Sequence, residues 1–220
     1  MSRHRHRKPA SHRNARASSP HSGKLRLIGG RFKRRLLSVP DSPGLRPTPD
    51  RVRETLFNWL AFELTGQRVL DLYAGTGALG FEALSRGAAE AVFVEAQPAV
   101  ARALQANIDT LGVTARLANA TTESFLAAPA EAPFALVFLD PPFRQGHVAP
   151  TCRALEDGGW LSEDAWIYVE HEAELAPEVP PTWRLYREVR AGDVHGRLYR
   201  RTPPPAGGAQ QAPPPAGGAC

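Results

Sequence analysis

Short apolar runs alternate with helical patterns between residues 68 and 169 of the chain. The apolar runs have the length of strands buried on both faces, and the helical patterns repeat apolar residues every three or four positions. This alternation predicts a doubly wound α/β fold with a mostly parallel sheet. The predicted strands are Arg68–Tyr73, Ala91–Glu95, Ala115–Ala118, Phe134–Leu139 and Ala165–Val169, and the predicted helices include Ala78–Arg86, Pro98–Leu111 and a segment around Cys152 and Leu155.

An antiparallel hairpin is expected at each end of this pattern. Trp183–Arg190 and Val194–Arg200 flank a short Ala-Gly-Asp turn, so they should add two antiparallel strands and bring the sheet to seven. Leu25–Ile28 and Leu36–Val39 flank a Gly-Gly pair and predict a small N-terminal β-hairpin extension. A helix should follow this extension, with Thr48 as its N-cap.

The charge of the chain is unevenly distributed. Residues 1–35 hold 12 of the 27 Lys and Arg residues and no acidic residue, so the remainder carries 15 basic residues against 22 acidic ones. A basic arm on a mildly acidic body is typical of a protein with a polyanionic partner, although a solubilising tail is the simpler alternative. The candidate phosphate contacts near the tip of the predicted hairpin are Arg31, Lys33, Arg34 and Arg35.

The composition argues against several classes of protein. Cys152 and Cys220 are too few for a disulfide framework, and no spacing of His and Cys residues indicates a metal site. No apolar stretch approaches the ~18 residues of a membrane-spanning helix, and no signal-peptide core follows the basic N-terminus. We therefore expect a cytoplasmic protein that binds neither a metal nor a membrane.

A glycine-rich loop follows the first predicted strand of the sheet. Gly75, Gly77 and Gly80 satisfy G-x-G-x-x-G, and Glu95 follows at the end of the next strand, where it can accept hydrogen bonds from ribose hydroxyls. Taken alone, this pattern indicates a dinucleotide-binding enzyme. Asp71, at the end of the first strand, changes that interpretation because a carboxylate beside a pyrophosphate is repulsive. A ligand with an ammonium and a sulfonium group, such as S-adenosylmethionine, fits better.

The strongest functional signal is Asp140-Pro141-Pro142-Phe143, directly after the apolar run 134–139. Two prolines cannot donate to a sheet ladder, so the strand must end at the edge where α/β sheets bind ligands. The Asp140 carboxylate and the Pro141 carbonyl could hold an exocyclic amino group while Phe143 stacks on the base. The simpler alternative is a strand-ending turn. Together with Asp71, the motif favours methyl transfer over hydride transfer.

The chain resembles the bacterial 16S rRNA guanine-N2 methyltransferase (RsmD) family. The N-terminal strings that carry this resemblance are long and discriminating, whereas the glycine loop is common to many methyltransferases. The resemblance implies a class I, Rossmann-like methyltransferase that transfers a methyl group from S-adenosylmethionine to one guanine of 16S rRNA, within a small-subunit particle. The matching segments are Leu27–Arg31, Pro40–Thr48, Asp50–Leu60, Leu70–Gly80, Glu82–Arg86 and Asp140–Arg144.

Three groups of site residues follow from these motifs. Asp140, Pro141 and Phe143 are expected to be catalytic. The predicted RNA contacts add Arg46, Arg51 and Arg144 to the four residues near the hairpin tip, although Arg51 and its neighbour Arg53 could be ordinary surface charges. The predicted cofactor-binding residues are Asp71, Ala74, Gly75, Thr76, Gly77, Glu95, Ala96, Thr121 and Thr48.

One of these residues departs from the family pattern. Thr121 stands where the family often has Asp or Asn to contact the adenine, so its hydroxyl or a backbone group would have to replace that contact.

The predicted organisation has four parts and one main function. Residues 1–23 form a disordered basic tail, 24–48 the hairpin extension, 49–202 the methyltransferase domain, and 203–220 a disordered tail rich in Pro, Gly and Ala. We expect a monomer. Two alternatives stay open: an N6-adenine DNA methyltransferase, and a non-catalytic RNA-binding factor in ribosome assembly.

Overall fold

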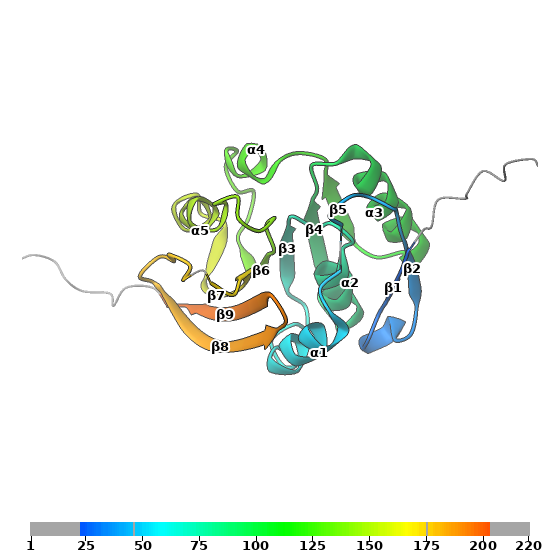
Figure 1. The fold of residues 1–220 in the computed structure, drawn as a ribbon, viewed down its shortest axis with the longest axis horizontal. Helices are drawn as coiled ribbons and strands as arrows, with labels where there is room; N and C mark the ends of the chain where they lie inside the picture. The colour runs from blue at the N-terminus through cyan, green and yellow to red at the C-terminus, as the bar shows by residue number, and fades with distance from the viewer. Residues whose placement is uncertain (1–22, 46, 175, 203–220) are drawn as a thin grey trace, which may run out of the picture.

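The computed structural model describes residues 23–202, except for Arg46 and Leu175 (Figure 1). Most of the two predicted tails, residues 1–22 and 203–220, and the predicted RNA contact Arg46 lie outside the described residues. Among the helices of the described part, none is long and apolar enough to cross a membrane.

A seven-stranded sheet forms the centre of the molecule, in the order β5-β4-β3-β6-β7-β9-β8. Strands β3 to β7 are parallel, and β9 runs antiparallel between β7 and β8. The predicted sheet, with its antiparallel C-terminal hairpin, is therefore confirmed. The strands are β3 (Arg68–Leu72), β4 (Glu90–Val94), β5 (Ala115–Ala118), β6 (Phe134–Leu139), β7 (Leu161–Glu172), β8 (Trp183–Ala191) and β9 (Val194–Arg201).

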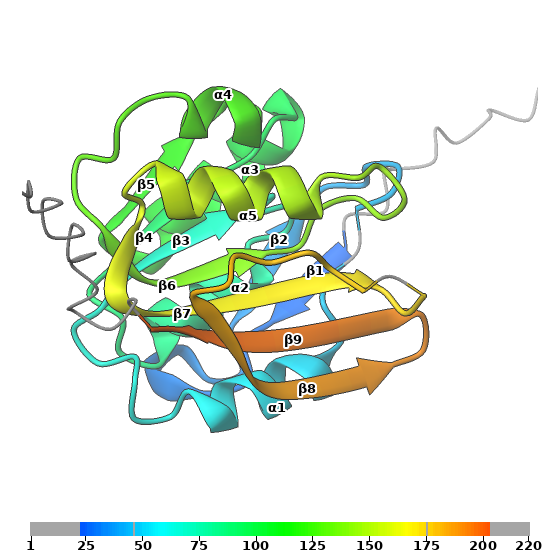
Figure 2. The ribbon, with the colours of Figure 1, turned by 90° about the vertical axis from the view of Figure 1, so that its left-hand side faces the viewer.

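Helices cover both faces of the sheet (Figures 1 and 2). Helices α1, α2 and α3 pack on one face, in a core that includes Leu56, Phe81, Leu104 and Phe138. Helices α4 and α5 pack on the other face, which presents residues such as Val137. The helices are α1 (Asp50–Trp59), α2 (Ala78–Ser85), α3 (Pro98–Leu111), α4 (Thr122–Leu126) and α5 (Val148–Asp157).

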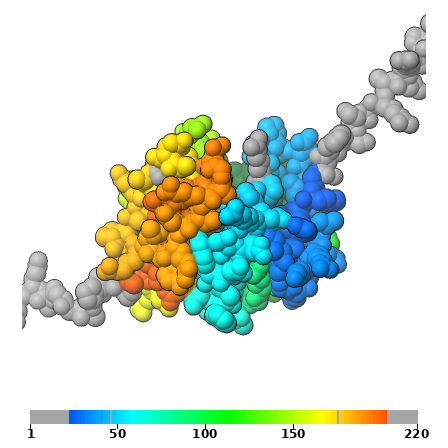
Figure 3. Space-filling model, turned by 60° about the horizontal axis from the view of Figure 1, so that its bottom comes forward, coloured from blue at the N-terminus to red at the C-terminus, as the bar shows by residue number. Residues whose placement is uncertain are grey.

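The N-terminal hairpin packs against the same face as α2 and α3. Strands β1 (Gly23–Arg26) and β2 (Leu36–Val39) pair antiparallel, and a 3₁₀ turn at Gly30–Phe32 lies in the connection between them. The predicted hairpin is thus confirmed, and it begins at Gly23, which the prediction placed in the disordered tail. In Figure 3 the hairpin lies beside α1 on one face of the molecule.

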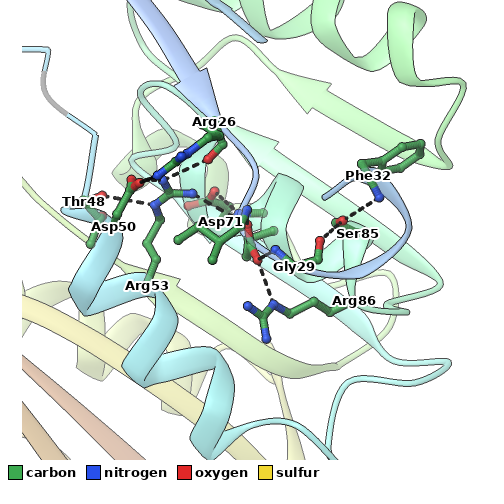
Figure 4. A network of polar contacts seen from close by, with 12 residues as sticks. Arg26, Gly29, Phe32, Thr48, Asp50, Arg53, Asp71, Ser85 and Arg86 are labelled. Carbon is green, nitrogen blue, oxygen red and sulfur yellow. Dashed lines mark hydrogen bonds and ion pairs between the residues drawn. The ribbon is translucent and has the colours of Figure 1, made fainter. Parts of the chain in front are cut away.

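A buried carboxylate joins the hairpin to α2. Glu82 is fully buried and accepts hydrogen bonds from the backbone N–H groups of Ile28 and Gly29, both at 2.8 Å. Ser85, one turn further along α2, accepts from the Phe32 N–H at 3.0 Å and donates to the Gly29 carbonyl (Figure 4). The hairpin therefore sits in a defined position on the domain.

The start of α1 differs from the prediction. Pro49, not Thr48, occupies the N-cap position, and Asp50 is the first helical residue. The reason is that Thr48 is buried and its hydroxyl lies against the Glu170 carboxylate, so it is not available to cap the helix. The short helix α4 was not predicted, because five residues are too few to show an apolar period.

Candidate active site

Four acidic side chains lie at or near the carboxyl ends of neighbouring parallel strands. Asp71 lies on β3, Glu95 directly follows β4, Asp140 directly follows β6, and Glu170 lies on β7. The pairing of Leu139 with Val169 puts the next residues, Asp140 and Glu170, side by side. Because β4, β3, β6 and β7 are consecutive in the sheet, the four carboxyl groups gather at this edge.

Asp71 stabilises the end of the glycine loop through a hydrogen bond from the first turn of α2. Its Oδ2 accepts a hydrogen bond from the Gly80 N–H at 2.9 Å, inside the first turn of α2. Burial raises the pKa of the Asp71 carboxyl well above its usual value, and the bond from Gly80 offsets part of this rise. A side chain at Gly80 would collide with Phe93 and with Asp71 itself, at 2.3 and 2.9 Å. The third glycine of the motif is thus required for close packing of helix on strand.

Glu95 supports the same loop from the neighbouring strand. Its two oxygens accept from the backbone N–H groups of Gly75 at 2.9 Å and Gln97 at 2.7 Å. Gly75 and Gly77 have positive φ angles of 52° and 74°, which glycine adopts without strain. Asn119, after β5, donates to the Glu95 carbonyl at 2.7 Å and joins the ends of these two strands.

Asp140 differs from the other three acids because no described residue donates a hydrogen bond to it. Burial raises the pKa of the Asp140 carboxyl to about 7. By contrast, Glu170 accepts a hydrogen bond from the Tyr168 hydroxyl at 3.1 Å. Burial and the neighbouring Asp140 charge raise the pKa of Glu170 well above its usual value, and Thr48 partly counters this. Of the four acids, Asp140 is therefore the one without a hydrogen-bond partner in the described part of the chain.

The segment between β2 and α1 crosses this edge of the sheet. A methyl group of Leu45 lies within 3.2 Å of the position that a Gly75 side chain would take, and the Ser42 hydroxyl donates to Gln97 at 2.9 Å. At the end of the segment, the Thr48 carbonyl accepts from the buried guanidinium of Arg53 at 3.1 Å (Figure 4). Leu45 therefore lies against the glycine loop, and Ser42 contacts Gln97, which follows β4.

The predicted catalytic motif lies at this acidic edge. Pro141 is buried, Phe143 is half-buried, and Arg144 is exposed with a positive φ of 61°. The structure thus brings Asp140, Pro141 and Phe143 next to the glycine loop that follows β3, because β3 and β6 are neighbours.

The remaining predicted cofactor contacts are distributed over the same edge. Ala74, Thr76 and Gly77 are buried in the loop, whereas Ala96 is exposed after β4. Thr121 is exposed, and its hydroxyl accepts from the Ser124 N–H at 3.2 Å as the N-cap of α4. Its contact with an adenine stays a prediction.

The predicted RNA contacts fall into two separate places. Arg51, in the first turn of α1, and Arg144 lie toward the acidic edge, and both are exposed. The hairpin residues 31 and 33–35 are also exposed, but their turn packs against Ser85 at the far end of α2. That end lies at the amino-terminal edge of the parallel strands. Arg53, considered above as a surface charge, is instead buried and is ion-paired with Asp50.

Two residues of this edge, Glu170 and Tyr168, were missed in the sequence. Both are buried on β7, and a side chain at Gly196 of β9 would lie 2.1 Å from the Tyr168 hydroxyl. Glu170 directly follows the predicted strand Ala165–Val169, so the rule that identified Asp140 could have identified it. Among the described residues, no three His, Cys, Asp or Glu side chains are grouped as a metal site.

The comparisons with known proteins agree with one another. Residues 25–200 match the family model described as "Conserved hypothetical protein 95". The chain is 53% identical to the ribosomal RNA small subunit methyltransferase D of Escherichia coli strain K12, over 82% of this chain and 91% of that protein. It is 42% identical to the protein of the same name from Haemophilus influenzae, over 81% of this chain and 94% of that protein.

The solved structures include a close match in fold. The Escherichia coli protein yhhF superimposes with a TM-score of 0.77 and 50% identity, covering 82% of this chain and 99% of that one. The family model covers most of the chain, and the identity to the two curated relatives extends over nearly their whole length. The chain therefore belongs to the ribosomal RNA small subunit methyltransferase D (RsmD) family, and the resemblance noted in the sequence is confirmed.

Proposed function

We propose that this protein transfers a methyl group from S-adenosylmethionine to the exocyclic N2 of one guanine in 16S rRNA. The observation that carries the proposal is the Asp140 carboxylate, which stands without a hydrogen-bond partner among the described residues at the ligand-binding edge of the sheet. Family membership supports the reaction type and the RNA substrate. The choice of N2 rests on the chemistry of the Asp-Pro-Pro-Phe motif.

The residues at this edge fit S-adenosylmethionine. This cosubstrate supplies the methyl group on a positively charged sulfur and also carries an ammonium group. Asp71, Glu95, Asp140 and Glu170 bring four carboxyl groups to the site, and none of the four is ion-paired with a basic side chain among the described residues. The ammonium and the sulfonium can pair with these carboxyl groups, whereas the pyrophosphate of a dinucleotide would be repelled by each one that is ionised. We propose that Glu95 holds the ribose, and that the loop 74–77 holds the methionine end.

The amino group of guanine needs help to react, because its lone pair is delocalised into the ring. In the proposed complex the Asp140 carboxylate and the Pro141 carbonyl accept its two hydrogens and aim the lone pair away from the ring plane. Phe143 stacks on the base and stabilises it by about 1–3 kcal/mol. Positioning of this kind is a large source of rate acceleration.

The reaction also releases one proton from N2 after the nitrogen has gained the methyl carbon. Burial raises the pKa of Asp140 to about 7, so its carboxylate is a better proton acceptor than an ordinary aspartate. We propose that Asp140 takes this proton and passes it to solvent.

The base must leave its stack to reach such a site, so an open region of rRNA is a better target than a duplex. We propose a small-subunit particle as the substrate.

The experiment that tests this function uses small subunits that lack the modification. The full chain, labelled S-adenosylmethionine and these subunits are incubated, and the methylated nucleoside is identified by mass spectrometry. The wild type should yield N2-methylguanosine at one position. Asp140→Ala should lose more than 99% of turnover while its affinity for S-adenosylmethionine, measured by calorimetry, stays within about threefold.

The matched control is Asp157→Ala, which removes an exposed carboxylate at the end of α5 and should leave turnover unchanged. Near-normal methylation by Asp140→Ala would refute the catalytic assignment. A product methylated on an adenine or on a ring nitrogen would refute the N2 specificity.

A further inference from the structure

A groove of about 560 Å³ lies on the side of the molecule away from Asp140. It runs between the hairpin turn, the end of α2 and the loops that precede β4 and β5. Among the described residues that line it, the charged ones are Arg31 and Arg86, and none is acidic. The lining residues are Gly30, Arg31, Leu84, Ser85, Arg86, Gly87, Ala88, Ala89, Gly112 and Thr114.

Arg86 is held in place with part of its guanidinium unused. Its Nε donates to Glu82 at 2.7 Å, and the group lies over the Phe57 ring at 5.3 Å. Gly29 allows this position, because a side chain there would come within 2.6 Å of the guanidinium. Among the described residues, neither terminal nitrogen of Arg86 has a hydrogen-bond partner. The two terminal nitrogens of a side chain held in place are thus available as hydrogen-bond donors at the groove.

The hairpin turn packs against the end of α2 and places one of its basic residues, Arg31, at the groove. Gly30 has a φ of +70°, and a side chain on it would lie 1.8 Å from the Ser85 carbonyl, so only glycine permits this contact. Arg31 follows directly, and its guanidinium lies 4.4 Å from the Phe32 ring centre. The turn therefore places Arg31 in the lining of the groove that also includes Arg86.

Three carbonyl groups at the end of α2 are already paired and therefore oppose an anion less strongly than free ones would. The carbonyls of Glu82, Ala83 and Leu84 already accept from the backbone N–H groups of residues 86–88, at 3.1 to 3.4 Å. The hairpin beside the groove is positively charged, since residues 23–40 contain six basic residues and no acid. Only Arg26 of these six is ion-paired within the described part of the chain, with Asp50 at 2.9 Å.

We propose that this groove binds the phosphate backbone of the RNA whose guanine enters the Asp140 site, with Arg31 and Arg86 as phosphate contacts. The proposal rests on the proposed function for the identity of the RNA. It adds a second place of contact at the opposite edge of the sheet. Helix α2 joins the two edges and its eight residues span about 12 Å, so the RNA must extend over several nucleotides to reach both.

The experiment measures the salt dependence of RNA binding by the full chain. A fluorescent fragment of small-subunit rRNA is titrated by anisotropy between 50 and 200 mM KCl. Each lost phosphate contact lowers the slope of log K against log salt by about 0.7–0.9, which makes the affinity change over this range about threefold smaller. Arg31→Gln and Arg86→Gln should each lower the slope by this amount, and the double variant should lower the slope by about twice this amount.

Arg184→Gln is the matched control. Arg184 is an exposed arginine on β8, far from the groove in the sheet, and it forms no ion pair within the described residues. Arg31→Gln keeps the proposal testable if Arg86→Gln fails to fold, because Arg31 is exposed. Unchanged slopes for Arg31→Gln, or an equal change for Arg184→Gln, would overturn the proposal.

The result separates the groove from the proposed reaction. If the wild type methylates subunits and the slopes do not change, only the groove proposal fails. If the wild type methylates no RNA but the slopes change as expected, the reaction assignment fails and the groove remains an RNA-binding site.

Discussion

Replacing Glu82 with glutamine should loosen the N-terminal hairpin and destabilise the whole domain. Glu82 is fully buried and accepts three hydrogen bonds of 2.7 to 2.8 Å, from the N–H groups of Ile28 and Gly29 and from Arg86. The guanidinium of Arg53 lies 3.6 Å away and is also buried. Glutamine has the same shape, so the substitution changes charge and hydrogen bonding but hardly changes volume.

The size of the effect follows from these contacts. A glutamine oxygen in the place of Oε1 can keep the hydrogen bonds from the Gly29 N–H and from Arg86, but the NH2 group then faces the Ile28 N–H, which is also a donor. The charge-assisted bond from the Ile28 N–H is lost, which costs about 1.5–3 kcal/mol, and Arg86 keeps its hydrogen bond but no longer faces a negative charge. Breaking a fully buried ion pair costs about 3–5 kcal/mol. Because Arg86 is partly exposed, the loss of its ion pair with Glu82 should cost about 3 kcal/mol or less. We expect a total loss of about 4 kcal/mol, a large part of the ~5–15 kcal/mol of a typical domain.

Urea unfolding followed by tryptophan fluorescence measures this loss, and hydrogen exchange locates it. The amide of Ile28, which loses its acceptor, should lose most of its protection in Glu82→Gln. The control is Glu90→Gln, which breaks the partly exposed pair with Arg68 at 2.9 Å and should cost about 1 kcal/mol or less. The reasoning is refuted if Glu82→Gln costs no more than Glu90→Gln.

Two further predictions concern the acidic edge. Gly196→Ala should cost about 1–3 kcal/mol in urea unfolding, because the new methyl group would lie 2.1 Å from the Tyr168 hydroxyl; a cost under about 0.5 kcal/mol would show that the strands have room. Burial raises the pKa of Asp140 from 3.8 to about 7, so between these values the folded state keeps a proton that the unfolded state has lost, and rising pH destabilises the folded state. The stability of Asp140→Asn relative to wild type should therefore increase by up to about 4 kcal/mol from pH 4 to pH 7 and then stay level, whereas a difference independent of pH would contradict the raised pKa.

The parallel strands and the catalytic motif could be predicted because each depends on a short stretch of sequence. The run 134–139 contains only apolar residues and ends at two prolines, and β6 occupies those six positions. Helix α3 also has the predicted limits, Pro98 and Leu111, because proline begins it and Gly112 ends it with a positive φ. These signals are local, so the limits of the two elements do not depend on tertiary contacts.

The role of individual polar residues could not be predicted in the same way. Thr48 has the sequence signature of an N-cap, but its burial against Glu170 depends on a contact across more than 100 residues. Arg53 lies among charged residues on a surface helix and is nevertheless buried, because the hairpin covers it and offers the Arg26 carbonyl as an acceptor. Such contacts form only once the hairpin is docked, and no local pattern reports them.

The position of the hairpin links the two proposed sites through α2. Asp71 receives the Gly80 N–H in the first turn of this helix, and Glu82, in the middle of the same helix, receives the hairpin backbone. One short buried helix therefore positions both the glycine loop at the acidic edge and the basic turn at the opposite edge. Since a helix of this length is stiff, a change at Glu82 that displaces the hairpin should also alter the loop at Gly80. It follows that Glu82→Gln should weaken S-adenosylmethionine binding as well as RNA binding, whereas Arg31→Gln, at an exposed position of the groove, should weaken RNA binding alone.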